Sequence, residues 1–151
     1  MLTKLISVDI SRLWDSVLKL AIKESIPPYV LLRNNTLTNI LEELLVGNIH
    51  CWIAHEPVES LEDELRIYAV IFTTFFDDIC SRTKSLMIYG IFALTLIPDL
   101  VWDEGIETLM KFGKEKDCSL IVGYSSNPII LQKVEALGGN TDYRYVTVPI
   151  E

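Results

Sequence analysis

The feature of the sequence that most constrains the fold is a strand–helix–strand unit in its second half. Ser85 to Ile97 is apolar and β-branched and predicts a strand, Val101 to Lys116 has the three- and four-residue spacing of an amphipathic helix, and Cys118 to Ser126 predicts another strand. Two strands joined through a helix run parallel in one sheet, with a right-handed crossover. The sequence therefore predicts a parallel strand pair covered by a helix.

An antiparallel meander is predicted just before this unit. Its first two strands are Ile49 to Glu56 and Leu65 to Ile79, and its third is the strand from Ser85. The acidic stretch "PVESLEDE" connects the first two, and "SRTK" turns the chain before the third. The predicted sheet is thus mixed, antiparallel on one side and parallel on the other.

The two ends of the chain predict further elements. Leu2 to Val8 reads as a short first strand, and a helix from Asp9 ends at the proline pair that begins at Pro27. A second helix, Thr36 to Gly47, ends on glycine.

After the crossover, Asn127 to Gly139 has the capping asparagine, first-turn proline and final glycines of a helix, and Asp142 to Ile150 reads as a closing strand. We expect a single α/β domain, residues 1–151, with helices on both faces of the sheet.

Composition excludes two classes of partner. The 151 residues carry a net charge of -8, and no lysine- or arginine-rich patch is present that would bind a phosphate backbone, so we expect no nucleic acid. The longest apolar stretch, Ser85 to Leu100, is too short to span a bilayer, and the N-terminus does not have the pattern of a signal peptide. We expect a cytoplasmic protein, or one carried in a virion. Half of the residues are hydrophobic, which favours a covered surface such as a homodimer interface.

Cysteines and histidines do not form a metal-binding pattern. Cys51, Cys80 and Cys118 are widely spaced and are expected to be buried free thiols. His50 and His55 lie five residues apart on a predicted strand and therefore face opposite sides, unless a bulge intervenes. We expect them to be surface or interface residues, and we predict no metal site.

The order of elements and two local stretches resemble the GNAT acetyltransferase superfamily. In outline, that family has a strand ending in V-x-P, then R/Q-x-x-G-x-G/A opening a helix, and later an asparagine that begins the last helix. Ile97 stands at the valine, Gly105 with Ile106 after it at the middle glycine, and Asn127 at the asparagine. The resemblance covers essentially the whole chain and implies a GNAT-like mixed sheet with a splayed parallel strand pair.

The resemblance also implies a cofactor and a substrate. In the family, acetyl-CoA or another acyl-CoA lies between the splayed strands, here Leu94 to Ile97 and Val122 to Ser125, and its diphosphate meets the backbone where the next helix begins. The substrate would be a small-molecule or peptide amine. The expected cofactor-binding residues are Leu96, Ile97, Gly105, Ile106, Tyr124 and Asn127.

The chemistry of the family motif is altered in this chain. Trp102 stands at the basic position and Glu107 at the last small residue, with Asp103 and Glu104 between them. Negative charge there would repel a diphosphate. Val134 stands where the family often has a tyrosine that protonates the leaving thiolate. The sequence therefore identifies no catalytic residue.

Three interpretations remain open from the sequence. One is a diverged GNAT-fold protein whose acyl-CoA loop is degenerate and which does not transfer acetyl groups. Another is an active acyl-CoA-dependent N-acetyltransferase. A third is a non-catalytic assembly or virion-associated protein, because the stretch "IKESIPPYV" and the helices around it faintly resemble small GNAT-like proteins of tailed phages.

Overall fold

The computed structural model describes residues 1–60 and 65–150, so positions 61–64 of the predicted acidic loop lie outside the described residues. A five-stranded sheet of order β1-β2-β3-β4-β5 forms the centre of this part of the chain. The strands are β1 (Leu2–Lys4), β2 (Ile49–His55), β3 (Ile67–Asp78), β4 (Thr83–Ala93) and β5 (Cys118–Gly123). Neighbours pair antiparallel except for β4 and β5, which pair parallel. The predicted mixed sheet is confirmed.

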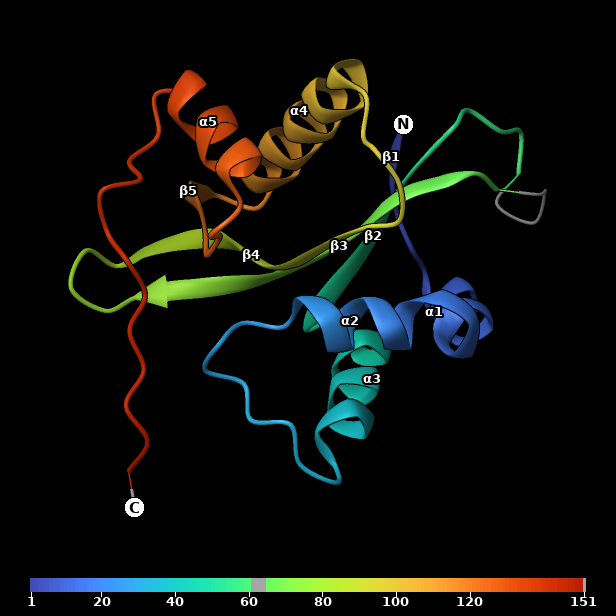
Figure 1. Ribbon diagram of the computed structural model, residues 1–151, viewed down its shortest axis with the longest axis horizontal. Coiled ribbons are helices and arrows are strands. Elements are labelled where there is room, and N and C mark those ends of the chain that lie inside the picture. Colours follow the sequence, from blue (N-terminus) through green and yellow to red (C-terminus); the bar gives the residue numbers. More distant parts are fainter. Residues whose placement is uncertain (61–64, 151) are drawn as a thin grey trace.

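Helices cover both faces of this sheet. The N-terminal helical stretch consists of α1 (Ser7–Leu13), the π-helical turn η1 (Trp14–Leu18) and α2 (Lys19–Ser25). The other helices are α3 (Thr36–Val46), α4 (Asp99–Glu115) and α5 (Pro128–Ala136). Figure 1 shows α1, α2 and α3 on one side of the sheet and α4 and α5 on the other. None of the described helices combines the length and apolar character needed to cross a membrane.

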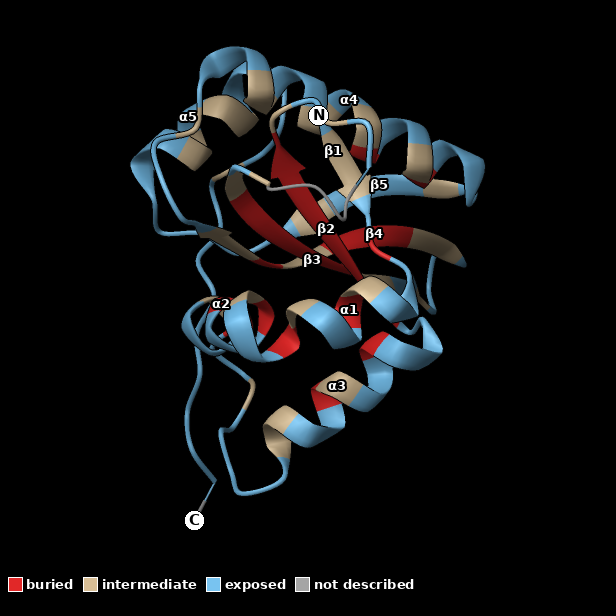
Figure 2. Ribbon diagram, turned by 90° about the vertical axis from the view of Figure 1, so that its right-hand side faces the viewer, coloured by how far each residue is buried: buried red, intermediate tan, exposed pale blue. Residues whose placement is uncertain are grey.

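The core is divided by the sheet into two apolar clusters. Leu18 and Ile22 from the N-terminal helices pack with Phe72 of β3 on one face. On the other face, Leu109 of α4 packs with Trp52 and Leu86. Figure 2 shows the buried residues concentrated along β2, β3 and β4 and along the helix faces that meet them. Burial of these side chains is the main force that holds the helices to the sheet.

The predicted closing strand, Asp142 to Ile150, is wrong. These residues have no strand assignment, and the chain there leaves the domain in an extended path (Figure 1). A strand is defined by its partner, and among the described residues no strand of the sheet pairs with this segment. Among the boundaries that differ, β1 ends at Lys4 and β4 at Ala93, both earlier than expected.

Both histidines and two of the three cysteines lie in other environments than expected. His50 and His55 are both buried, not surface residues, and the register of β2 does shift between Ala54 and His55. Their rings nevertheless have different partners, Thr73 for His50 and Thr3 for His55. Of the three cysteines, Cys51 is buried as expected, whereas Cys80 is exposed and Cys118 is partly exposed. Among the described residues, no group of three His, Cys, Asp or Glu side chains could hold a metal ion.

Candidate functional site

The parallel strands β4 and β5 separate partway along their length. Their pairing ends at Ile88 opposite Gly123, whereas β4 continues to Ala93 beside β3. A bulge accompanies this point, because Phe72 pairs with Gly90 and Thr73 with Ile88, which leaves Tyr89 as the additional residue. Bulges re-aim a strand and end its pairing. The edge of β4 from Tyr89 to Ala93 therefore has no β5 neighbour, which is the splay that the GNAT resemblance implies, beginning earlier on β4 than expected.

A cavity of about 530 Å³ lies between the sheet, α4 and α5. Its lining is mainly apolar, and Lys114 and Lys133 are its charged side chains among the described residues. The lining residues include Ile88 of β4, Leu120 and Ile121 of β5, Ile97, Val101, Trp102, Gly105, Ile106 and Leu109 of α4 and the loop before it, and Ile130 and Val134 of α5. An apolar hollow with a few polar groups at its rim is typical of small-molecule sites.

Helix α4 begins at Asp99, which places the family motif differently from the sequence-based expectation. Gly105 lies in the second turn of the helix, where backbone amides take part in the helix's own hydrogen bonds. The amides of Val101 and Trp102 donate to the Pro98 carbonyl at 3.0 and 3.1 Å. The amides of Asp99 and Leu100, at the start of the helix, have no intrahelical acceptor. A diphosphate bound by this helix would therefore meet Asp99, not Gly105.

The Asp99 carboxylate is bound to a lysine from α5. Lys133 Nζ lies 2.8 Å from Asp99 Oδ1, and this hydrogen bond and charge lower the pKa of the Asp99 carboxyl. The sequence did not suggest this pairing, because the two residues are 34 positions apart. A basic residue is thus present at the helix start, but its charge is already compensated.

A second acidic residue of α4 also has a cationic partner. The N-terminal amino group of Met1 lies 3.1 Å from Glu104 Oε2. Both groups are largely exposed, so the pair contributes little to stability. Asp103 and Glu107 are exposed on the same helix. The helix start therefore remains an acidic surface.

Four tyrosines gather where β4 and β5 separate. Tyr89 follows the last paired residue of β4 and Tyr124 the last residue of β5. The Tyr29 ring lies 6.4 Å from Tyr89, 5.9 Å from Tyr124 and 5.8 Å from Tyr145, and the Tyr124 and Tyr145 rings are 4.4 Å apart. Tyr89 packs on the face covered by α1, α2 and α3, so the cluster closes the gap on that side.

Burial and the neighbouring tyrosines raise the pKa of Tyr29 to about 12. Burial also raises the pKa values of Tyr89 and Tyr124. The phenols of Tyr29, Tyr89 and Tyr124 therefore remain protonated at neutral pH, so they can donate hydrogen bonds but cannot accept a proton from an ammonium group.

The structure brings together some of the predicted cofactor-binding residues. Ile97, Gly105 and Ile106 line the cavity. Leu96 is exposed, and Asn127 caps α5, since its Oδ1 accepts a hydrogen bond from the Ile129 amide at 2.9 Å. Tyr124, which the sequence suggested as a pocket residue, joins the tyrosine cluster. The sequence missed Tyr29, because nothing local places a loop residue against β4.

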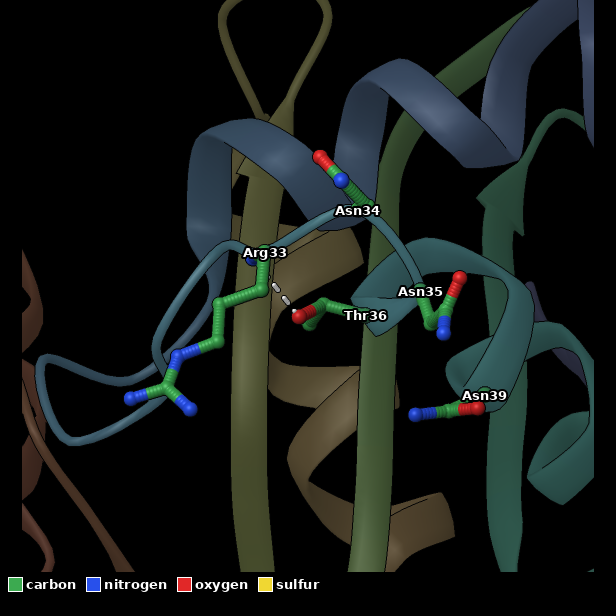
Figure 3. A pocket seen from close by; sticks show the side chains of 5 residues that line it. All are labelled: Arg33, Asn34, Asn35, Thr36 and Asn39. Carbon is green, nitrogen blue, oxygen red and sulfur yellow. Dashed lines mark hydrogen bonds between the residues drawn. The ribbon is translucent and has the colours of Figure 1, made fainter.

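A separate polar hollow of about 520 Å³ lies over the start of α3. Its lining residues are Arg33, Asn34, Asn35, Thr36 and Asn39, and Figure 3 shows their side chains pointing in different directions. The Thr36 hydroxyl accepts a hydrogen bond from the Arg33 amide at 2.9 Å and donates one to the Leu31 carbonyl at 2.7 Å. These contacts stabilise the turn before the helix, and we assign the hollow no function.

Comparison with solved structures identifies the fold. A probable acetyltransferase superposes with a TM-score of 0.71 at 13% identity, covering 100% of this chain and 98% of its own. The aminoglycoside N-acetyltransferase AAC(6')-Iy, in complex with a bisubstrate analogue, gives 0.67 at 18% identity, covering 100% and 97%. A predicted acetyltransferase with acetyl-CoA from Clostridium acetobutylicum gives 0.65 at 16% identity, covering 99% and 95%.

No family model matches the sequence, and no curated protein sequence matches it either. At these identities the structural likeness establishes the fold alone. The chain has the fold of GNAT acetyltransferases, as the resemblance implied.

Proposed function

We propose that this chain is a diverged GNAT-fold protein in which the diphosphate end of the acyl-CoA site has been lost, so that acetyl transfer no longer occurs. The observation that carries this proposal is the Asp99 carboxylate at the start of α4, bound to Lys133 at 2.8 Å. A diphosphate arriving there would meet a carboxylate whose nearest cation is already engaged. Each such like-charge contact costs about 1 kcal/mol in water at 4 Å, and more where water is excluded.

The groups around the strand gap support the same proposal. Transfer to an amine requires the amine to lose its proton before it attacks the thioester. The side chains gathered at the gap are tyrosines, and the raised pKa of Tyr29, about 12, makes it a poor proton acceptor at neutral pH. Val134, at the position of the family tyrosine, lines the cavity and cannot donate a proton. Among the described side chains at the gap, none is suited to take the proton from the amine.

A second candidate function is an active acyl-CoA-dependent N-acetyltransferase. The observation that favours it is the free edge of β4 from Tyr89 to Ala93, which leaves backbone groups available to a pantetheine arm. Two of the similar structures contain acetyl-CoA or a CoA-derived analogue, which makes acyl-CoA a reasonable ligand for this fold. The two candidates differ at the start of α4: an active enzyme requires it to bind the diphosphate of acyl-CoA, whereas the diverged protein does not.

Replacing Asp99 by asparagine tests this difference. Asp99→Asn removes the carboxylate and frees Lys133, so we expect the dissociation constant for coenzyme A to fall about tenfold, measured by isothermal titration calorimetry at fixed ionic strength. Asp103→Asn is the matched control, because Asp103 is an exposed carboxylate further along the same helix, and it should change the constant less than about twofold.

An intact acyl-CoA site would give the opposite pattern. Micromolar binding by the unmodified protein, with Asp99→Asn equal to it or weaker, would show that the Asp99 carboxylate does not oppose the diphosphate. An amine-dependent release of free thiol from acetyl-CoA by the same preparation would establish the second candidate instead.

A further inference from the structure

The cavity between the sheet, α4 and α5 is an unfilled part of the apolar core. Its volume is about 530 Å³, and its lining is mainly apolar. None of the described residues of α5, which lies over it, is fully buried, and Leu120 of β5, which lines it, is 62% exposed. Protein interiors are normally packed without voids of this size. Apolar surface that is left open in this way is typical of a binding site.

The cavity extends along most of α4. The residues of this helix that line it recur at three- and four-residue steps, from Val101 and Trp102 near its start to Gly113 and Lys114 in its last turn. The helix rises about 20 Å between Val101 and Lys114, at about 1.5 Å per residue. A space of this length suits an extended hydrocarbon chain better than a compact ring system.

The two ends of the cavity differ in character. Where α4 leads into β5, the lining includes the ammonium group of Lys114 and the hydroxyl of Ser119. Within residues 1–60 and 65–150, no acidic side chain forms an ion pair with Lys114. At the other end, Lys133 is already bound to Asp99 at 2.8 Å, and Ile130, one turn before it, is apolar. The cavity therefore offers an available cation at one end and hydrocarbon along the rest.

Other charged groups near the Lys114 end lie outside the cavity. The charges of Asp77, Asp117 and Lys84 reach Cys118, which lines the cavity, but none of these three is among its described lining residues. The carbonyl groups at the end of a helix carry a partial negative charge, which Lys114 in the last turn of α4 offsets. An anion that enters the cavity at this end thus meets the lysine first.

We propose that the cavity binds one long-chain fatty acid, with its carboxylate at Lys114 and Ser119 and its hydrocarbon chain lying along α4 toward Trp102. A carboxylate and an ammonium group form a charge-assisted hydrogen bond, and the chain fills the apolar part of the cavity. The proposal rests on the proposed function, since a chain held in this way lies where the arm of acyl-CoA would lie and needs no diphosphate site.

Calorimetry with palmitate, kept below the concentration at which it aggregates, tests the proposal. We expect one palmitate to bind per chain with a micromolar dissociation constant. Lys114→Met keeps most of the side chain but removes its charge, and should weaken binding about tenfold. Lys111→Met is the matched control, because Lys111 is an exposed lysine of α4 that does not line the cavity, and it should change the constant less than about twofold.

A second variant tests the position of the chain. A Cβ on Gly105, which lines the cavity, would have Leu2 Cδ2 as its nearest neighbour at 4.0 Å, so a larger side chain has room to enter. Gly105→Leu should therefore weaken palmitate binding at least about tenfold, without lowering the urea midpoint of the protein.

Fluorescence tests the direction of the chain. Palmitate that carries a bromine atom on its last carbon should quench the fluorescence of Trp102, because the proposed chain ends beside this ring. The quenching should disappear in Trp102→Phe, in which Trp14 and Trp52 remain in the core.

Four results would overturn the proposal. If neither palmitate nor acetyl-CoA binds, the fatty-acid site is wrong and the proposed function stands. If acetyl-CoA binds at micromolar concentration and palmitate does not, both are wrong. If palmitoyl-CoA binds more tightly than palmitate, the chain arrives as a thioester and not as the free acid. If palmitate binds equally to the unmodified protein, Lys114→Met and Gly105→Leu, it occupies another surface.

Discussion

Gly90→Ala is expected to lower the free energy of unfolding by roughly 2–3 kcal/mol, because a methyl group at this position overlaps the end of α2. A Cβ on Gly90 would lie 2.6 Å from both the carbonyl oxygen and the hydroxyl oxygen of Ser25. The hydroxyl can rotate, but the carbonyl belongs to the last turn of the helix and cannot move without shifting it. The loss is measured by urea denaturation followed by circular dichroism.

Gly105→Ala is the matched control for this prediction. Gly105 lies inside α4, and the nearest atom to an added Cβ is Leu2 Cδ2 at 4.0 Å. Alanine is preferred to glycine in a helix interior by up to about 1 kcal/mol, so this variant should be more stable than the unmodified protein. Equal effects of the two substitutions would contradict the close contact between α2 and β4. That contact matters for the site, because it fixes β4 in the region where β5 has separated from it.

Acidification from pH 7 to pH 5 is expected to reduce stability by about 2 kcal/mol through His50 alone. His50 is 8% exposed, and its ring packs against Phe75 and Phe112 at 4.9 and 5.2 Å. Burial, and then the charges of Lys4 and Lys116, lower its pKa to about 4. The ordinary histidine pKa, about 6.5, applies in the unfolded chain.

The direction of this effect follows from the two pKa values. Between about pH 4 and pH 6.5 the unfolded chain binds a proton at this position and the folded chain does not, so lower pH favours unfolding. The stabilisation is complete above pH 6.5 and is lost as the pH falls toward 4. Urea titrations at pH 7 and pH 5 measure it. His50→Gln, which does not titrate, should lose about 2 kcal/mol less on acidification than the unmodified protein. An equal loss in both would contradict a buried neutral histidine.

The elements that the sequence predicted correctly are those in which local pattern and burial agree. The strands β2 and β3 and the helix from Thr36 have a clear period and lie in the core or against it, so their bounds differ little from expectation. Asn127 begins α5 and Gly47 ends α3 as expected, because capping depends on neighbouring residues. The segment from Asp142 has the same strand pattern as β3, but pairing is not a local property, and the segment has no partner within the described chain.

The candidate site could also be predicted only in part, because contacts between distant elements are not a local property of the sequence. The resemblance identified the separation of β4 and β5 and placed Ile97, Gly105 and Ile106 near one another, since these follow from the order of elements. The pairing of Asp99 with Lys133 joins two helices, and the Tyr29 contacts join a loop to β4 and β5. Contacts of this kind depend on how the elements pack and leave no signal in the local sequence.

The most direct test of whether the diphosphate end of the site has been lost is a comparison of two ligands with the unmodified protein. Acetyl-pantetheine has the thioester and the arm of acetyl-CoA but lacks the diphosphate, and both can be titrated by calorimetry at the same ionic strength. Since Asp99 and the acidic surface of α4 oppose the diphosphate, we predict that acetyl-CoA binds no more tightly than acetyl-pantetheine. If acetyl-CoA binds tenfold more tightly or better, the start of α4 attracts phosphate and the diphosphate end of the site has not been lost.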